Sequence, residues 1–304
     1  MVKNQHYVPR FYLRQFANDQ GQCWAFHKDT EKAFATSVAN IASEGYFYDD
    51  QKLDRITGVN QFVENYLGEL EAAFSPFLTK FLADVDQWKI KKLDQDTREK
   101  LCEFIVFQII RTKEHRESIY QGITQFQEQM AASGWLPDEM IASMRQDDTK
   151  SRAKKNQIEQ IVFDSDFRNS IQEILNSHIW IMFKNLGLVP YYTSDHPVVK
   201  RPHINRPHRG DSGYRSKGIE IAMPLSATHL LVMFERTYFK ELEYRENSIL
   251  VHRDAEDIDS YNSMQVSQSF RGIYCSSGQF KLAKDMVKEY PELKNLHHQR
   301  FGSA

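Results

Sequence analysis

The sequence contains few cysteines and no long run of apolar residues. Its three cysteines, Cys23, Cys102 and Cys275, are scattered, and such an odd, sparse set favours a reducing compartment over a disulfide framework. No apolar run approaches the ~20 residues that cross a bilayer. The polar and basic residues after Met1 do not resemble the apolar core of a signal peptide. We therefore expect a cytoplasmic protein with no membrane contact.

Several motifs that carry known chemistry are also missing. The chain has no phosphate-binding glycine loop, no dinucleotide fingerprint and no cluster with zinc spacing. The missing nucleophile elbow argues against a Ser–His–Asp hydrolase. A net charge of −2 argues against a protein that coats nucleic acid through its overall charge, although it is compatible with a local basic patch.

The sequence does contain a helical middle between two strand-rich ends. Helical spacing of apolar residues predicts a helical core over about 59–186, and shorter apolar runs predict strands within about 1–58 and 187–290. This order favours an α+β fold: a central helical bundle with N- and C-terminal strands that pair into one sheet. We expect residues 1–304 to form a single domain, near the upper size for one core.

Two of the long helices expected in this middle segment are separated by a basic linker. The first is predicted from about 96 towards 130, and its apolar stretch 101–110 is typical of a helix buried on all sides. Residues 150–155 read as the basic linker, and the second helix is predicted over about 157–186. His178 lies on the apolar stripe of the second helix and is expected in the core.

The N-terminal stretch is rich in aromatic rings for a chain end. Residues 4–16 read Asn-Gln-His-Tyr-Val-Pro-Arg-Phe-Tyr-Leu-Arg-Gln-Phe. We expect this segment to pack into the fold, because so much exposed apolar surface is unfavourable. His6 suits acid–base chemistry near neutral pH, and Arg10 suits a phosphate clamp. The alternative is that His6 only anchors the chain end.

Gln108, Arg111 and His115 are spaced to share one face of the first predicted helix. A buried guanidinium needs a partner. Arg111 is therefore expected either to pair with Glu44 or Glu71, or to bind an anion at the floor of a cleft. His115 is expected at the surface.

The sequence Thr-Ser-Asp-His-Pro, residues 193–197, follows a predicted strand. Asp195 thus lies where loops next to strands commonly display catalytic side chains. An Asx turn that satisfies its own backbone is the alternative. Asp195, Glu44 and His6 are also the candidates to hold a divalent metal, if the site uses one.

Basic residues concentrate in the segment 200–217, which contains one acidic residue, Asp211. Such a loop is expected either to contact the phosphates of a nucleotide or nucleic acid, or to be a solvated insertion between two strands. The candidate nucleic-acid-binding residues are Arg201, Arg206, Arg209, Arg215 and Lys217.

Four stretches of the chain resemble a bacterial family known only as a domain of unknown function. The resemblance spans about residues 3–275 and implies positions rather than an established activity. In relatives the residue after the motif aspartate is often Asn, whereas this chain has His196. The motif stretches are Gln-His-Tyr-Val-Pro-Arg-Phe-Tyr-Leu from Gln5, then 44–48, 107–112, and 193–197 followed by 224–226.

These residues favour phosphodiester cleavage in RNA or DNA, as in a bacterial toxin or a phage-defence effector. In this hypothesis His6 is the acid or base, Arg10 and Arg111 clamp phosphate, and Gln108 and Asp195 orient the reacting groups. We expect at least four of these five side chains to line one cavity. A non-catalytic nucleotide- or protein-binding module and a nucleotide-dependent transferase are the alternatives.

Overall fold

The computed structural model describes residues 2–135, 137, 139–140, 148–204 and 212–299. The strands are β1 (Asn4–His6), β2 (Gln22–His27), β3 (Lys32–Ser37), β4 (Ser43–Gly45), β5 (Ile179–Asn185), β6 (Thr193–Ser194), β7 (Val199–Pro202), β8 (Ile219–Ser226), β9 (His229–Phe234), β10 (Ile249–His252) and β11 (Gly272–Cys275). The α-helices are α1 (Arg10–Leu13), α2 (Gln51–Thr57), α3 (Phe62–Asp86), α4 (Gln95–Ile110), α5 (Lys113–Ala132), α7 (Thr149–Val162), α8 (Ser165–Asn176), α9 (Ala255–Gln268) and α10 (Lys281–Glu289). Short 3-10 turns are η1 (Arg14–Phe16), η2 (Val38–Asn40), η3 (Lys240–Arg245) and η4 (Pro291–Lys294).

The α+β class is confirmed, and strands from the two ends of the chain share a sheet. Antiparallel pairing of β11 with β2 and β6 gives the order β3-β2-β11-β6. The strands do not all join this sheet, however. A five-stranded sheet has the order β10-β5-β9-β8-β7, and β1 pairs with β4 in a separate ribbon. The expectation of one sheet is therefore replaced by two main sheets.

The prediction of a helix over 157–186 is wrong after Asn176. Its first part forms α7 and α8, but its apolar end forms β5, an inner strand of the five-stranded sheet. Alternate residues of β5 face two cores: Trp180 packs with the core of α3, α4 and α8, and Ile181 packs with that of α9. A strand buried on both faces is apolar throughout, so periodicity alone cannot distinguish it from a buried helix. His178 is buried, as expected.

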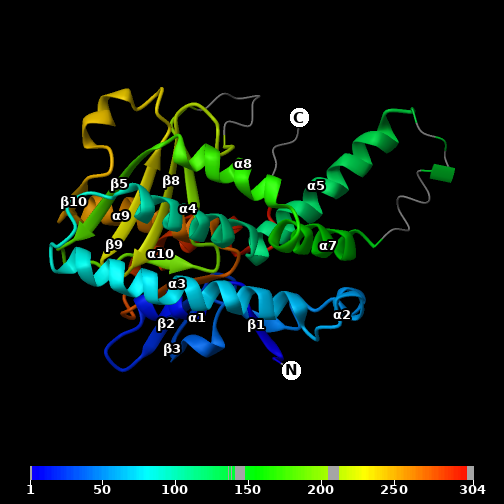
Figure 1. The fold of residues 1–304 in the computed structure, drawn as a ribbon, viewed down its shortest axis with the longest axis horizontal. Coiled ribbons are helices and arrows are strands. Elements are labelled where there is room, and N and C mark those ends of the chain that lie inside the picture. The colour runs from blue at the N-terminus through cyan, green and yellow to red at the C-terminus, as the bar shows by residue number, and fades with distance from the viewer. Residues whose placement is uncertain (1, 136, 138, 141–147, 205–211, 300–304) are drawn as a thin grey trace.

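The helix predicted from about 96 to 130 is divided in the structure. α4 is buried over 104–110, as predicted, and ends at Ile110. Thr112 then caps α5, because its side-chain oxygen accepts the His115 N–H at 3.2 Å. The break lets α5 leave the body of the molecule and run beside α7 (Figure 1). The expected basic linker is also wrong, since residues 150–155 lie inside α7.

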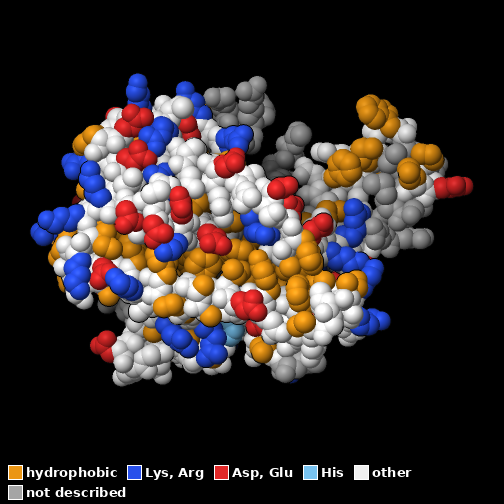
Figure 2. All heavy atoms as spheres, in the orientation of Figure 1, with side chains coloured by type: hydrophobic (Ala, Val, Ile, Leu, Met, Phe, Trp, Pro, Cys, Tyr) orange, Lys and Arg blue, Asp and Glu red, His pale blue; other side chains and the backbone are white. Residues whose placement is uncertain are grey.

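The N-terminal segment packs into the core, as predicted. Val8, Tyr12 and Leu13 are completely buried, and the Phe11 and Tyr12 rings lie 5.7 and 6.0 Å from the Phe104 ring of α4. α3 crosses the front of this region, where Figure 2 shows a band of hydrophobic side chains along it. Within the described ranges, no helix has both the length and the apolar character of a bilayer span.

Candidate functional site

Arg111 is buried at the end of α4 and holds the N-terminal segment in place. Its Nη2 donates to the His6 carbonyl oxygen at 2.7 Å and to Glu71 Oε1 at 2.8 Å. The predicted internal ion pair is therefore confirmed with Glu71 as the partner. Glu44, the other candidate, pairs with Lys113.

Burial and neighbouring charges shift the protonation of the groups around Arg111. Burial lowers the pKa of His6, and the nearby Arg10 lowers it further, so the ring is neutral at pH 7. Burial raises the pKa of Glu64 to about 7, although Arg111 opposes this shift and Glu71 adds to it. The Nε2 atom of His6 is buried without a hydrogen-bond partner.

The cavity beside Arg111 is too small for a substrate. Its volume of about 10 Å³ holds one water molecule. Gln108 and Arg111 line it, and no described residue bonds to the buried Gln108 Oε1 and Arg111 Nε atoms. His6, Arg10 and Asp195 do not line it. Of the five side chains expected to line one cavity, Gln108 and Arg111 thus share this one, and His6 and Arg111 are in direct contact.

Asp195 is buried elsewhere and clamps the backbone at the start of β11. Its Oδ1 accepts the Phe270 N–H at 2.8 Å, and its Oδ2 accepts the N–H groups of Arg271 and Gly272 at 2.8 and 2.7 Å. Burial raises the pKa of Asp195 to about 6, although these three amide bonds oppose the shift. The carboxylate therefore bonds to backbone groups, as in the Asx-turn alternative. These groups belong to a distant segment rather than to its own turn.

The Asp195 clamp predicts a pH dependence of stability. The carboxyl has a pKa of about 6 in the fold and of about 4 in the unfolded chain. At a pH between these two values, the native state therefore binds more protons than the unfolded state. The free energy of unfolding should therefore rise as pH falls from 7 to 5, by on the order of 1 kcal/mol from this group. Urea unfolding at both pH values should show the gain in the wild type and its loss in Asp195→Asn. The same gain in the variant would assign the effect to other groups.

The motif stretches contact one another directly. The Tyr12 hydroxyl lies 2.7 Å from Thr193 Oγ1 and donates to the Pro224 carbonyl at 2.6 Å. The Tyr48 hydroxyl donates to the Arg111 carbonyl at 2.5 Å. Buried hydrogen bonds therefore join motif residues that lie far apart in the sequence.

Thr112, the residue after Arg111, contacts two histidines of a much larger cavity. Its Oγ1 atom caps α5 at the His115 N–H and also lies 3.2 Å from His196 Nδ1. Both histidines, together with Lys200, line a cavity of about 520 Å³, here called the His196 cavity. This volume lies in the range of small-molecule sites, roughly 300–1,000 Å³.

His115 is arranged as a proton acceptor in this cavity. Its Nε2 lies 2.6 Å from Gln160 Oε1. An amide oxygen only accepts, so Nε2 carries the ring proton and Nδ1 is the acceptor. Burial lowers the pKa of His115, so the ring is neutral at pH 7. The expectation of a surface position is wrong: His115 is half-buried, because α5 runs beside α7 and Gln160 of α7 contacts the ring.

Lys200 places a cation in the wall of the His196 cavity. Gln268 holds its backbone from both sides, because Oε1 accepts the Lys200 N–H at 2.9 Å and Nε2 donates to its carbonyl at 2.8 Å. The ammonium lies 4.5 Å from the centre of the Tyr214 ring. Burial lowers the pKa of Lys200, and within the described part of the chain no carboxylate opposes this shift. The acidic residue of the lining, Glu114, lies 3.9 Å from His298 Nε2 instead.

Amide side chains at three-residue spacing on α9 hold the segment 190–200, which carries His196 and Lys200. Residues three apart share a helix face, so one face of α9 holds the whole segment. The spacing Asn-x-x-Gln-x-x-Gln was present in the sequence and was the signal that could have located this support. The contacts are Tyr192 N–H to Asn262 Oδ1 (2.7 Å), Gln265 Nε2 to the Pro197 carbonyl (2.8 Å) and the two Gln268 bonds to Lys200.

The structure describes two parts of the basic segment 200–217, residues 200–204 and 212–217. Arg201 contacts α9, where its Nη2 donates to the Ser260 carbonyl and hydroxyl, both at 2.9 Å. A role of the segment in nucleic-acid binding stays a prediction. Two of its candidate residues are exposed, Arg215 and Lys217, and two lie outside the described residues, Arg206 and Arg209.

The suggested metal ligands do not come together. Glu44 pairs with Lys113, and both oxygens of Asp195 accept backbone N–H groups. Among the residues that the structure describes, no three His, Cys, Asp or Glu side chains are grouped so that they could hold a metal ion.

Comparisons with known proteins were made for the whole chain. Searches of the curated proteins and of the solved structures found no match. Residues 4–279 match the family described as "Protein of unknown function (DUF4238)". This range contains the four motif stretches and the three residues of the His196 cavity named above. The resemblance to a domain of unknown function is thus confirmed, and the chain belongs to the DUF4238 family.

Proposed function

We propose that the chain binds a phosphate group of a nucleic acid in the His196 cavity and cleaves a phosphodiester bond there. The observation that carries the proposal is Lys200, a partly desolvated ammonium in the wall of a 520 Å³ cavity, whose lowered pKa no carboxylate of the described residues opposes. A cation in such a position favours an anionic ligand, because burying an unpaired charge is costly.

The histidines supply the groups that the reaction needs. Phosphodiester cleavage requires a base for the proton of the nucleophile, an acid for the leaving oxygen, and cations for the charge that grows on the phosphoryl group. In this proposal His115 Nδ1 accepts the first proton, His196 donates the second, and Lys200 binds the phosphoryl oxygens. Thr112 positions both histidines, through its bonds to the His115 N–H and the His196 ring.

Four of the five residues first considered catalytic have supporting roles in this proposal. Arg111, His6 and Glu71 form the hydrogen bonds that fix the end of α4, immediately before Thr112. Asp195 fixes the segment before His196 against β11. Gln108 lines the water-sized cavity next to Arg111. These side chains act on the site through the backbone and do not line the His196 cavity.

The proposal is tested with Lys200→Met, which removes the charge and keeps the length of the side chain. Cleavage of single-stranded RNA and DNA oligonucleotides, measured with and without divalent ions, should fall by about 10²–10³-fold, as when one stabilising group is lost. Nucleotide binding should weaken in parallel. Lys281→Met, at a lysine that is 91% exposed on α10, is the matched control and should change neither.

Two results separate the alternatives. Nucleotide binding by the wild type without any cleavage would support a binding module or a nucleotide-dependent transferase, and a search for a second substrate would follow. If Lys200→Met binds phosphate and nucleotides as tightly as the wild type does, the His196 cavity is not the phosphate site.

A further inference from the structure

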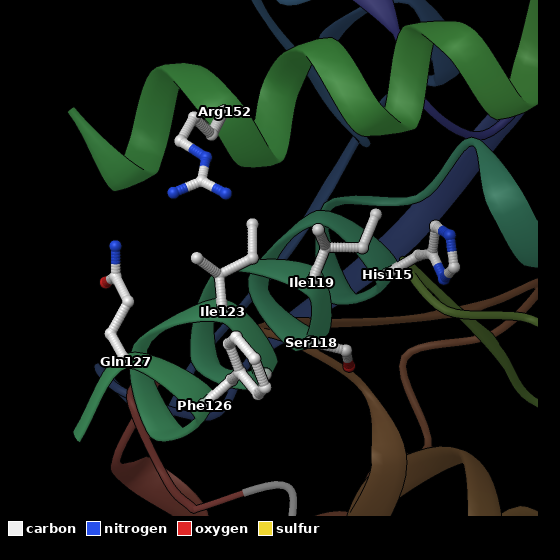
Figure 3. Close-up of a pocket in the computed structure, with 8 residues that line it drawn as sticks. His115, Ser118, Ile119, Ile123, Phe126, Gln127 and Arg152 are labelled. Atoms are coloured by element: carbon white, nitrogen blue, oxygen red, sulfur yellow. The ribbon is translucent and has the colours of Figure 1, made fainter. Parts of the chain in front are cut away.

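A second hollow adjoins the His196 cavity along α5. This α5–α7 groove has a volume of about 450 Å³, and His115 and Ser118 line both cavities. Figure 3 shows His115 at one end of the groove and Gln127 at the other, with Arg152 extending from α7. A ligand held near His115 in the first cavity can therefore extend into the second.

The α5–α7 groove has an apolar floor and polar ends. Figure 3 shows Ile119 and Ile123 on the side of α5 that faces α7, where Arg152 reaches towards them. Phe126 adds an aromatic ring that is 57% exposed to solvent. Flat aromatic ligands suit such a groove: aromatic and guanidinium planes stack on their faces, and amide or guanidinium groups bind their polar edges.

The charge around the groove favours a nucleotide over an apolar peptide as its ligand. The first turns of α7 carry exposed basic residues in the segment 150–155 noted in the sequence, and one of them, Arg152, lines the groove. Like Lys200, these side chains favour a ligand with negative charges beside its apolar part. Nucleic-acid strands have this combination, since each base adjoins a phosphate. The exposed basic residues of this segment are Lys150, Arg152 and Lys155.

We infer that the α5–α7 groove binds a base of a single-stranded nucleic acid whose phosphate lies in the His196 cavity. The inference rests on the proposed function and names its ligand class. Ile119, Ile123 and Phe126 contact the face of the base, and the ribose-phosphate passes His115. A double-stranded ligand does not fit this arrangement, because its bases are stacked inside the duplex.

The test measures binding of inorganic phosphate, adenosine monophosphate and a single-stranded oligonucleotide to the full chain by calorimetry. In Phe126→Ala the preference for adenosine monophosphate over inorganic phosphate should fall about tenfold, within the range measured for base–aromatic stacking. Phe126→Tyr should retain the preference. Tyr244→Ala removes another exposed ring, 74% exposed on η3, and is the matched control that should change nothing.

The outcomes separate this inference from the proposed function. A preference for adenosine monophosphate that is lost in Phe126→Ala and kept in Phe126→Tyr and Tyr244→Ala supports the base subsite. Equal binding of phosphate and nucleotide by the wild type, or an unchanged preference in Phe126→Ala, overturns the subsite and leaves the proposed function standing. Tighter binding of duplex than of single strand also overturns it. No binding of any phosphate probe by the wild type overturns the proposed function and the inference together.

Discussion

His115→Ala should lower the rate of phosphodiester cleavage by about 10²–10⁴-fold, the usual contribution of a general acid or base. The reason is that the bond to Gln160 leaves Nδ1 of His115 as an unprotonated acceptor in the His196 cavity. The expected loss lies in the turnover number rather than in substrate affinity, because Lys200 still holds the phosphate.

The pH profile distinguishes a base from a merely structural residue. Burial lowers the pKa of His115 below its usual value near 6.5. The wild-type rate should therefore rise with pH through this lowered pKa and level off before pH 7, and the rising limb should disappear in His115→Ala. His297→Ala, at a histidine that is 78% exposed, is the matched control. A full rate in His115→Ala, or an unchanged rising limb, would exclude His115 as the base.

The fold class could be predicted from the sequence, and so could the position of the N-terminal segment. Both rest on local composition: helical periodicity in the middle, and aromatic residues that had to be buried at one end. β5 could not be predicted, because its partners β9 and β10 lie far along the chain and an apolar run of its length fits either structure. Which sheet a strand joins depends on such distant pairing, so the division into two sheets could not be predicted from the sequence either.

The candidate site was predictable in part. The cost of burying Arg111 predicted an internal partner, and Glu71 is that partner. The size of a cavity depends on packing between distant elements, however, so the sequence could not show that the space beside Arg111 holds one water. It also could not show which of the six basic residues in 200–217 enters a cavity. Lys200 does so because Gln268, 68 residues later, fixes its backbone.

The single break between α4 and α5 explains much of the difference between expectation and structure. A continuous helix would have placed His115 two turns beyond Gln108 on one face. Thr112 ends this continuity, and its hydroxyl contacts both the His115 N–H and the His196 ring. Thr residues favour such cap positions, yet a Thr within a strongly apolar helical pattern gives little warning of a break.

Arg111→Met should destabilise the chain by about 3–5 kcal/mol, as expected when one partner of a buried charge pair is removed. The substitution leaves the Glu71 carboxylate without its cation and the His6 carbonyl without its donor. Glu71 is 29% exposed, so solvent compensates part of its charge and the lower end of this range is expected. Urea unfolding at pH 7 measures the loss.

Two controls make the Arg111 result specific. Arg236→Met removes an arginine that pairs with Glu246 but is 37% exposed, and a pair so exposed should cost no more than about 1 kcal/mol. Arg111→Lys keeps the charge but places it on a side chain of different length and shape, so an intermediate loss is expected. A stability change in Arg111→Met no larger than in Arg236→Met would contradict the structural role. If that stable variant also lost phosphate binding, Arg111 would have to face the ligand, and the His196 cavity would not be the phosphate site.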